Sequence, residues 1–150
     1  MNQTNAERIE SLKAGIFGAI GAGLALGGLE VVGLIVRRMG AGEPIANLFS
    51  RHSLSWEWIG LVPRAIVLFS GFLFGVTYRY VMRQDQNPQL KMGAVMAFGL
   101  VRGLAHVGEL AQWDGVRSGI QILDSVLLFT GAGLALDWAL RRGWIKPFDA

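Results

Sequence analysis

The chain has 150 residues, of which 52% are hydrophobic and only 17% are charged. A soluble domain carries about 25% charged residues, so the composition favours one transmembrane domain spanning residues 1–150. The net charge is +3, but Lys and Arg cluster at the ends of apolar runs, so we expect no nucleic-acid partner. The lack of cysteine excludes disulfides, thiolate metal sites and cysteine nucleophiles.

Four apolar runs predict helices at about 12–36, 59–82, 91–112 and 117–140. A span of roughly 20 residues crosses the ~30 Å hydrocarbon core of a bilayer. The predicted fold is therefore an all-α integral membrane four-helix bundle with up-down-up-down topology. Eight Lys and Arg fall on the side of the termini and five on the other, which predicts that both termini are cytoplasmic.

Small residues recur within these runs at a spacing of four. Helices in lipid approach one another closely where such residues form a stripe, so we expect these positions to pack helices together. The alternative is that the glycines are merely tolerated in a membrane helix. The expected helix-packing residues are Gly15, Ala19, Gly23, Gly27, Gly71, Gly75, Gly99 and Gly103.

The connection between the first two runs is the longest, and its sequence allows two further predictions. Its middle, 44–52, is expected to form a short amphipathic turn of helix on the membrane surface. Trp56 and Trp58 follow it as interfacial anchors. At the far end of the second run, Tyr78, Arg79 and Tyr80 are expected to mark the opposite interface.

Three ionisable residues inside the runs are the main candidate site. Arg102 lies eleven residues after Lys91, about 16 Å along a helix, and Asp124 lies about 10 Å below the opposite boundary. Their depths nearly coincide, and an isolated charge there costs at least about 3 kcal/mol. We therefore predict an Arg102–Asp124 ion pair with His106 beside it. Its role is either a clip that sets helix register, a transport or proton-relay site, or a contact with a lipid headgroup, quinone or pigment.

Charged residues near the ends of the runs form a second, weaker set. Glu30 and Glu109 are expected at similar heights near the outer boundary, where they form either a possible cation site or simply a wetted interface, and Arg64 is near enough in height to neutralise one of them. Asp137 and Arg141 are four residues apart and predict an ion pair within one helix.

Nothing in the chain has the spacing of a catalytic or metal centre. His52 and His106 lack a cysteine or carboxylate at zinc spacing, and the glycines of the first run do not follow a strand. We therefore expect no enzyme activity, catalytic residue, metal or cofactor.

The chain also contains a candidate internal repeat. Lys13, Gly15, Ala19, Gly21 and Leu26 are matched 78 positions later by Lys91, Gly93, Ala97, Gly99 and Leu104. The match suggests two tandem helical hairpins, as in some small transporters. Chance similarity between Gly- and Leu-rich segments is the alternative.

The segment LFSGFLFGVTYRYVMRQDQNPQLKMGAVMAFGLVRGLA and the closing GWIKPF resemble a family of small, uncharacterised multi-pass membrane proteins of cyanobacteria and plastids. The resemblance is close at about 68–105 and loose elsewhere. It implies a plasma or thylakoid membrane of a photosynthetic host, and it implies no activity.

Two functions remain after these observations. The first is an accessory or assembly subunit beside a larger, photosynthetic membrane complex, which requires the stripe from Gly15 to Gly27 to face outward. The alternative is a small homo-oligomeric transporter or channel, in which the intramembrane charges line one cavity. The expected partners are the lipid bilayer and either a larger complex or a second copy of the chain.

Overall fold

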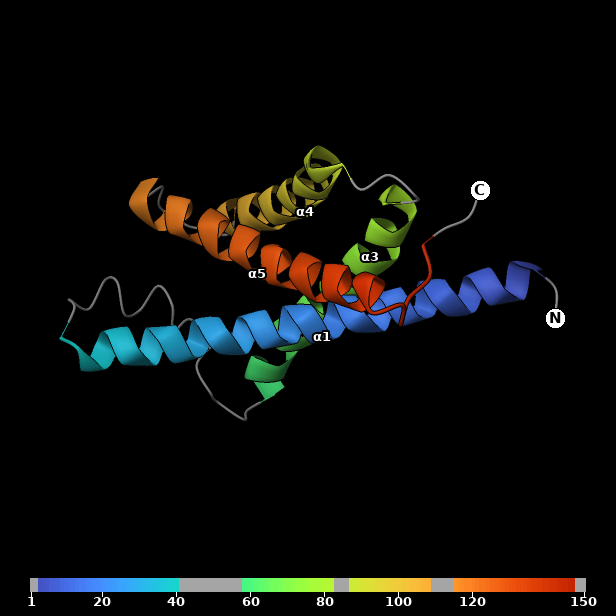
Figure 1. The fold of residues 1–150 in the computed structure, drawn as a ribbon. Coiled ribbons are helices and arrows are strands. Elements are labelled where there is room, and N and C mark those ends of the chain that lie inside the picture. Colours follow the sequence, from blue (N-terminus) through green and yellow to red (C-terminus); the bar gives the residue numbers. More distant parts are fainter. Residues whose placement is uncertain (1–2, 41–57, 83–86, 109–114, 148–150) are drawn as a thin grey trace.

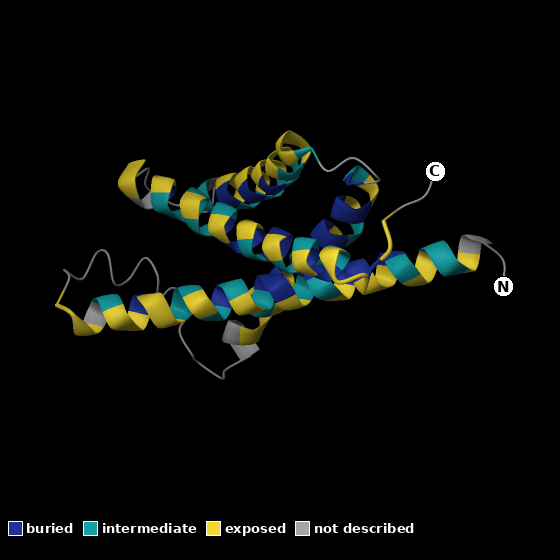
Figure 2. Ribbon diagram, in the orientation of Figure 1, coloured by how far each residue is buried: buried dark blue, intermediate teal, exposed yellow. Residues whose placement is uncertain are grey.

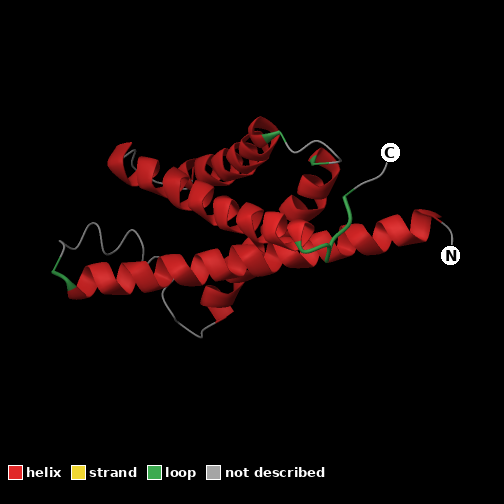
Figure 3. Cartoon of the chain, viewed as in Figure 1, coloured by secondary structure: helices red, strands yellow, loops and turns green. Residues whose placement is uncertain are grey.

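The computed structural model describes residues 3–40, 58–82, 87–108 and 115–147, and these fold into helices without strands (Figures 1 and 3). The helices are α1 (Gln3–Arg38), α3 (Trp58–Val81), α4 (Pro88–Gly108) and α5 (Gly115–Arg141). Each contains a stretch long and apolar enough to cross a membrane. The prediction of an all-α chain with four such helices is therefore confirmed for the described residues.

Two helices begin earlier than expected because polar residues stabilise their first turns. α1 starts at Gln3 rather than near residue 12, and its polar first turns contact Arg79 through Glu7 and Ser11. α4 starts at Pro88, a residue suited to the first helical position because its missing N–H would have no partner there. The side chain of Asn87 caps this helix by accepting a hydrogen bond of 3.0 Å from the Gln89 N–H.

The end of α5 turns the chain back toward α1. Gly143 has a φ of +72°, a left-handed conformation that costs glycine little. The N–H of Gly143 donates to the carbonyl of Leu140, and the N–H of Trp144 donates to the carbonyl of Ala139. This is the Schellman pattern of helix termination. It carries Ile145, which is 1% exposed, into the core.

The helices are packed unequally. α1 packs mainly against α3 and α5, and α4 packs mainly against α5, whereas α3 and α4 contact each other only weakly. Figure 1 shows α1 as the longest helix, with α5 along it and α3 crossing it. The buried residues gather where α1, α3 and α5 meet, and exposed residues dominate α4 and the far half of α1 (Figure 2).

The closest helix contact is between α1 and α3, where backbone lies against backbone. A methyl group on Gly71 would lie 2.7 Å from the Gly18 carbonyl oxygen, and one on Gly75 would overlap the Ala14 carbonyl. Gly18, which the spacing-of-four argument did not include, therefore contributes directly to this contact.

The predicted stripe on α1 is covered by α3 over most of its length. A methyl group on Gly15 would overlap the Phe72 ring, and one on Gly23 would lie 3.1 Å from Leu68. Ala19 lies against Gly71 in the same interface, whereas a methyl group on Gly27 would meet no described atom of another element within 4 Å. The stripe thus packs helices within the chain, and only its end remains open.

The other helix pairs use the same principle. A methyl group on Gly99 would lie 2.8 Å from the Val126 Cα atom, and one on Gly103 would lie 2.7 Å from the Ile122 Cα atom. These contacts join α4 to α5. On α1, Gly21 approaches Ala132 of α5 equally closely.

Candidate functional site

The α3/α4 cleft is a cavity of about 620 Å³ between α3 and α4, which contact each other only weakly. Two of its lining residues, Phe98 and Phe129, pack with the buried Phe74 in an aromatic cluster whose ring centroids are 5.2 to 5.6 Å apart. α3 and α4 each present one helical face to it. The lining residues are Pro63, Ile66, Ser70, Leu73, Ala97, Phe98, Val101, Arg102, Ala105, His106 and Phe129.

Among the described residues that line this cleft, Arg102 and His106 are the ionisable ones. They lie one turn apart on α4, and both are partly buried. His106 Nδ1 is 3.0 Å from the carbonyl oxygen of Arg102. Because a carbonyl only accepts, Nδ1 carries the proton, and Nε2 is left as the other ring nitrogen for a ligand.

The direct Arg102–Asp124 ion pair is not formed. Asp124 lies close enough to sense the charges of Arg102 and His106, but Arg102 has no hydrogen-bond or ion-pair acceptor among the side chains that the structure describes. The predicted depths of Arg102 and Asp124 along their helices allow a pair, but the rotation of α5 about its axis does not bring Asp124 into the close contact with α4. Asp124 is two residues from Ile122 and from Val126, which face α4, and two residues turn a helix by about 200°.

The outer-boundary set contains one close contact in the described part of the chain. Arg64 of α3 and Glu30 of α1 form an ion pair with an N–O distance of 3.4 Å. Glu109, the third residue of this set, lies outside the described residues, as do 44–52 and Trp56. A carboxylate neutralised in this way is a poor ligand for a cation.

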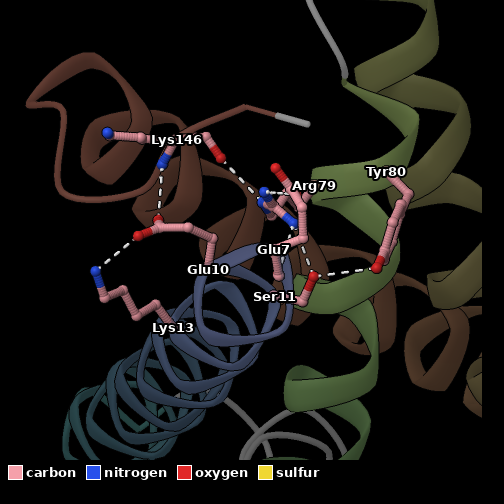
Figure 4. A network of polar contacts seen from close by, with 7 residues as sticks. All are labelled: Glu7, Glu10, Ser11, Lys13, Arg79, Tyr80 and Lys146. Carbon is pink, nitrogen blue, oxygen red and sulfur yellow. Dashed lines mark hydrogen bonds and ion pairs between the residues drawn. The ribbon is translucent and has the colours of Figure 1, made fainter. Parts of the chain in front are cut away.

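Sequence reasoning missed the Arg79 network, which consists of Glu7, Glu10, Ser11, Arg79 and Lys146 (Figure 4). Arg79 was expected at an interface, but it is 1% exposed. Its guanidinium donates to Glu7 Oε2 at 2.5 Å and to Ser11 Oγ at 2.7 Å. It also donates to the Lys146 carbonyl at 2.9 Å, while Glu10 accepts from the Lys146 N–H at 3.0 Å.

A signal for this network exists in the first turns of α1. Glu7, Glu10 and Ser11 follow the three- and four-residue spacing of one helical face, so they present two carboxylates and a hydroxyl together. An arginine flanked by tyrosines at the end of an apolar run is a natural partner for such a face. The pairing is long-range, however, and periodicity does not indicate which run supplies the partner.

The Asp137 cluster consists of Tyr78, Lys91 and Asp137 and lies near the same end of α3. Tyr78 donates from its hydroxyl to Asp137 Oδ1 at 2.8 Å, and Lys91 donates to Oδ2 at 2.7 Å. Asp137 therefore pairs with residues of α3 and α4, and the predicted pair with Arg141 is wrong. Arg141 is exposed on the helix surface, where an ion pair between solvent-exposed groups contributes little to stability.

Two buried polar side chains on α5 were also not anticipated. Ser118 Oγ and both amide atoms of Gln121 are buried without a hydrogen-bond partner among the described residues. Buried amides are normally paired, so these atoms mark a polar position on the outer half of α5.

No group of three or more His, Asp or Glu residues with metal-binding geometry occurs within the described ranges. Comparisons with protein-family models, curated proteins and solved structures return no match to this chain.

Proposed function

We propose that the chain is an integral membrane protein with four spans in up-down-up-down order. Many large apolar side chains face outward, among them Leu24 (72% exposed), Val101 (71%) and Leu134 (66%). A soluble domain rarely leaves so large an apolar surface open, whereas a bilayer covers it. The order of the spans is supported by contacts of Glu7 with Arg79 and of Glu30 with Arg64, which join opposite ends of α1 and α3.

The excess of Lys and Arg on the side of the termini supports a cytoplasmic position for both ends of the chain. The Arg79 network and the Asp137 cluster would then lie at the cytoplasmic boundary. The resemblance to cyanobacterial and plastid proteins supports a plasma or thylakoid membrane as the location.

For the biochemical role, we propose a small carrier that binds an anionic molecule in the α3/α4 cleft. The observation that supports it best is the described lining of this cleft, which is apolar apart from Arg102, His106 and Ser70. Ionisable groups inside a membrane span mark substrate or ion pathways by default. Neither Asp124 nor Glu30 is among the described lining residues, so the Arg102 guanidinium faces the cleft without a carboxylate beside it there.

The experiment is anion flux in liposomes containing the purified chain. Butanesulfonate is a suitable probe because its sulfonate stays ionised and does not cross a lipid bilayer unaided. We expect the wild type to accelerate its uptake, and we expect Arg102→Gln to lower that uptake at least tenfold. The matched control is Arg141→Gln, which removes an exposed charge outside the cleft. Equal uptake by wild-type and protein-free liposomes would exclude the carrier.

The second proposal is an accessory or assembly subunit of a larger membrane complex. Its supporting observation is the far half of α1, where a methyl group on Gly27 or Gly28 would meet no described atom of another element within 4 Å and Val31 and Ile35 are 54% and 51% exposed. Native migration after mild detergent extraction tests it. Co-migration with a much larger complex that Gly27→Leu abolishes supports this role, and migration only as a small homo-oligomer excludes it.

A further inference from the structure

We infer that the α3/α4 cleft binds an amphiphile with an acidic oxyanion head group and one acyl chain. This inference rests on the proposed membrane insertion and names the class of anion that the proposed carrier takes. Arg102 and His106 bind the head group, and the apolar part of the cleft holds the chain.

The acidic head group is inferred from the hydrogen-bond donors of Arg102. A guanidinium has five N–H donors in a rigid fork that matches the oxygens of a carboxylate or phosphate. None of these donors has an acceptor among the described side chains, and Asp124 compensates the charge only at a distance. In a span, an unpaired charge is strongly unfavourable. An acidic head group would remove that cost and satisfy the donors.

His106 adds a second contact for the same head group. Its Nδ1 is committed to the Arg102 carbonyl, which orients the ring. Nε2 then accepts a hydrogen bond from the OH of a protonated acidic head group, or donates to its oxygens when the ring carries a second proton. Because both residues lie on one face of α4, one turn apart, they are able to contact the same group of oxygens.

The acyl chain follows from the shape and lining of the rest of the cleft. From Arg102, the cleft extends along α4 to Ala97, about 7.5 Å at 1.5 Å per residue. Leu73, Phe98 and Phe129 line its apolar end. With the acid at Arg102, this end holds the first part of one acyl chain, and the rest of the chain continues into the bilayer, whereas a short anion leaves the apolar end unfilled.

The volume and the position favour a single-chain lipid that enters from the bilayer. At about 620 Å³, the cleft falls within the range of cavities that bind drug-sized ligands, which are smaller than two-chain phospholipids. α3 and α4 contact each other only weakly, and Val101 of the lining is 71% exposed. The cleft is therefore open sideways, toward the acyl chains of the membrane.

The first experiment is native mass spectrometry of the full chain, purified in mild detergent and incubated with oleate, oleyl alcohol or butyrate. We expect one oleate per chain, no retained oleyl alcohol because it lacks the acid, and at least tenfold weaker retention of butyrate because it lacks the long chain. Arg102→Gln is expected to weaken oleate binding at least tenfold, and Arg141→Gln is expected to leave it unchanged.

The second experiment locates the bound acyl chain in the cleft, using variants that keep every charge of the protein. Ala97→Phe fills the apolar end of the cleft, and Ala65→Phe makes the same change on exposed α3 surface outside the lining. A fatty acid with a photoreactive group in the first part of its acyl chain is expected to cross-link near Leu73 and Phe98 in the wild type and in Ala65→Phe. In Ala97→Phe we expect this cross-linking to fall at least fivefold.

Three results would overturn the inference: oleate binding that Arg102→Gln does not change, equal binding of oleyl alcohol, or cross-links spread evenly over the lipid-facing surface. These results are separable from a failure of the proposed carrier. Butanesulfonate flux without oleate binding retains the carrier and excludes the lipid, whereas oleate binding without flux retains the binding site and excludes transport.

Discussion

The Arg79 guanidinium donates a 2.9 Å hydrogen bond from Nε to the backbone carbonyl of Lys146, 67 residues further along the chain. The same guanidinium contacts Glu7 and Ser11 on α1. One buried side chain therefore ties the start of α1, the end of α3 and the segment after α5 together. This arrangement suggests that the Arg79 network stabilises the fold rather than binding a ligand.

Replacing Arg79 by Ala is expected to destabilise the protein by about 3 kcal/mol, because it removes a buried charge that satisfies several acceptors. Arg79→Lys should recover part of this loss, since a lysine keeps the charge but lacks the fork of donors. The measurement is the unfolding midpoint in mild detergent. The control is Arg8→Ala on the exposed face of α1, and an equal effect of the two alanine variants would contradict the prediction.

Tyr78→Phe is expected to cost about 1.5 to 3 kcal/mol, the range for a hydrogen bond to a charged group. The ring stays packed against Phe74, with 5.4 Å between centroids, so only the bond to Asp137 is lost. Equilibrium unfolding of Tyr80→Phe gives the comparison, because Tyr80 is 44% exposed and should lose less than 1 kcal/mol on removal of its hydroxyl. A larger loss for Tyr80 than for Tyr78 would refute this assignment.

Gly75→Ala is expected to destabilise the α1–α3 contact by about 1 to 3 kcal/mol, because the new methyl group overlaps the Ala14 backbone carbonyl and the helices must separate. Gly93→Ala is the matched control, since open space surrounds Gly93 on α4. There alanine should be neutral or stabilise by up to about 1 kcal/mol through helix propensity. Thermal unfolding in detergent distinguishes the two, and a tolerated Gly75→Ala would argue against this close packing.

Gln121→Leu is expected to leave the free energy of unfolding unchanged or to raise it by about 1 kcal/mol, because the buried amide has no partner among the described residues. Leucine has a similar size and no polar group to desolvate. Unfolding measured in both detergent and lipid checks this. A clear loss of stability in lipid alone would mean that the bilayer environment supplies a partner for the amide.

The sequence was sufficient to predict the helices, because runs of about 20 apolar residues have few alternatives. It also predicted Gly71, Gly75, Gly99 and Gly103 as packing positions, and the structure confirms close helix contacts there. The residues at which the helices begin were less predictable. α1 begins within a polar segment because its partners, Arg79 and Lys146, come from distant parts of the chain.

The candidate site illustrates a different limit. Counting residues gave compatible depths for Arg102 and Asp124, but depth leaves the rotation of each helix undetermined. That rotation is set by Gly99 and Gly103, which lie against Val126 and Ile122, so these two residues and not Asp124 occupy the close α4–α5 contact. The α3/α4 cleft could not be predicted at all, because it depends on which helices do not pack together.

The Arg79 network also has a consequence for biosynthesis. Its acceptors come from residues 7 and 146, so it is complete only after residue 146 has been synthesised. Until then α1 and α3 are held by their glycine contacts and by the contacts of Arg79 with Glu7 and Ser11, and the Arg79 guanidinium lacks its Lys146 acceptor. A chain truncated before Lys146 would therefore leave a charge in the core with one acceptor missing, which would favour its recognition by the quality-control proteases of the cell.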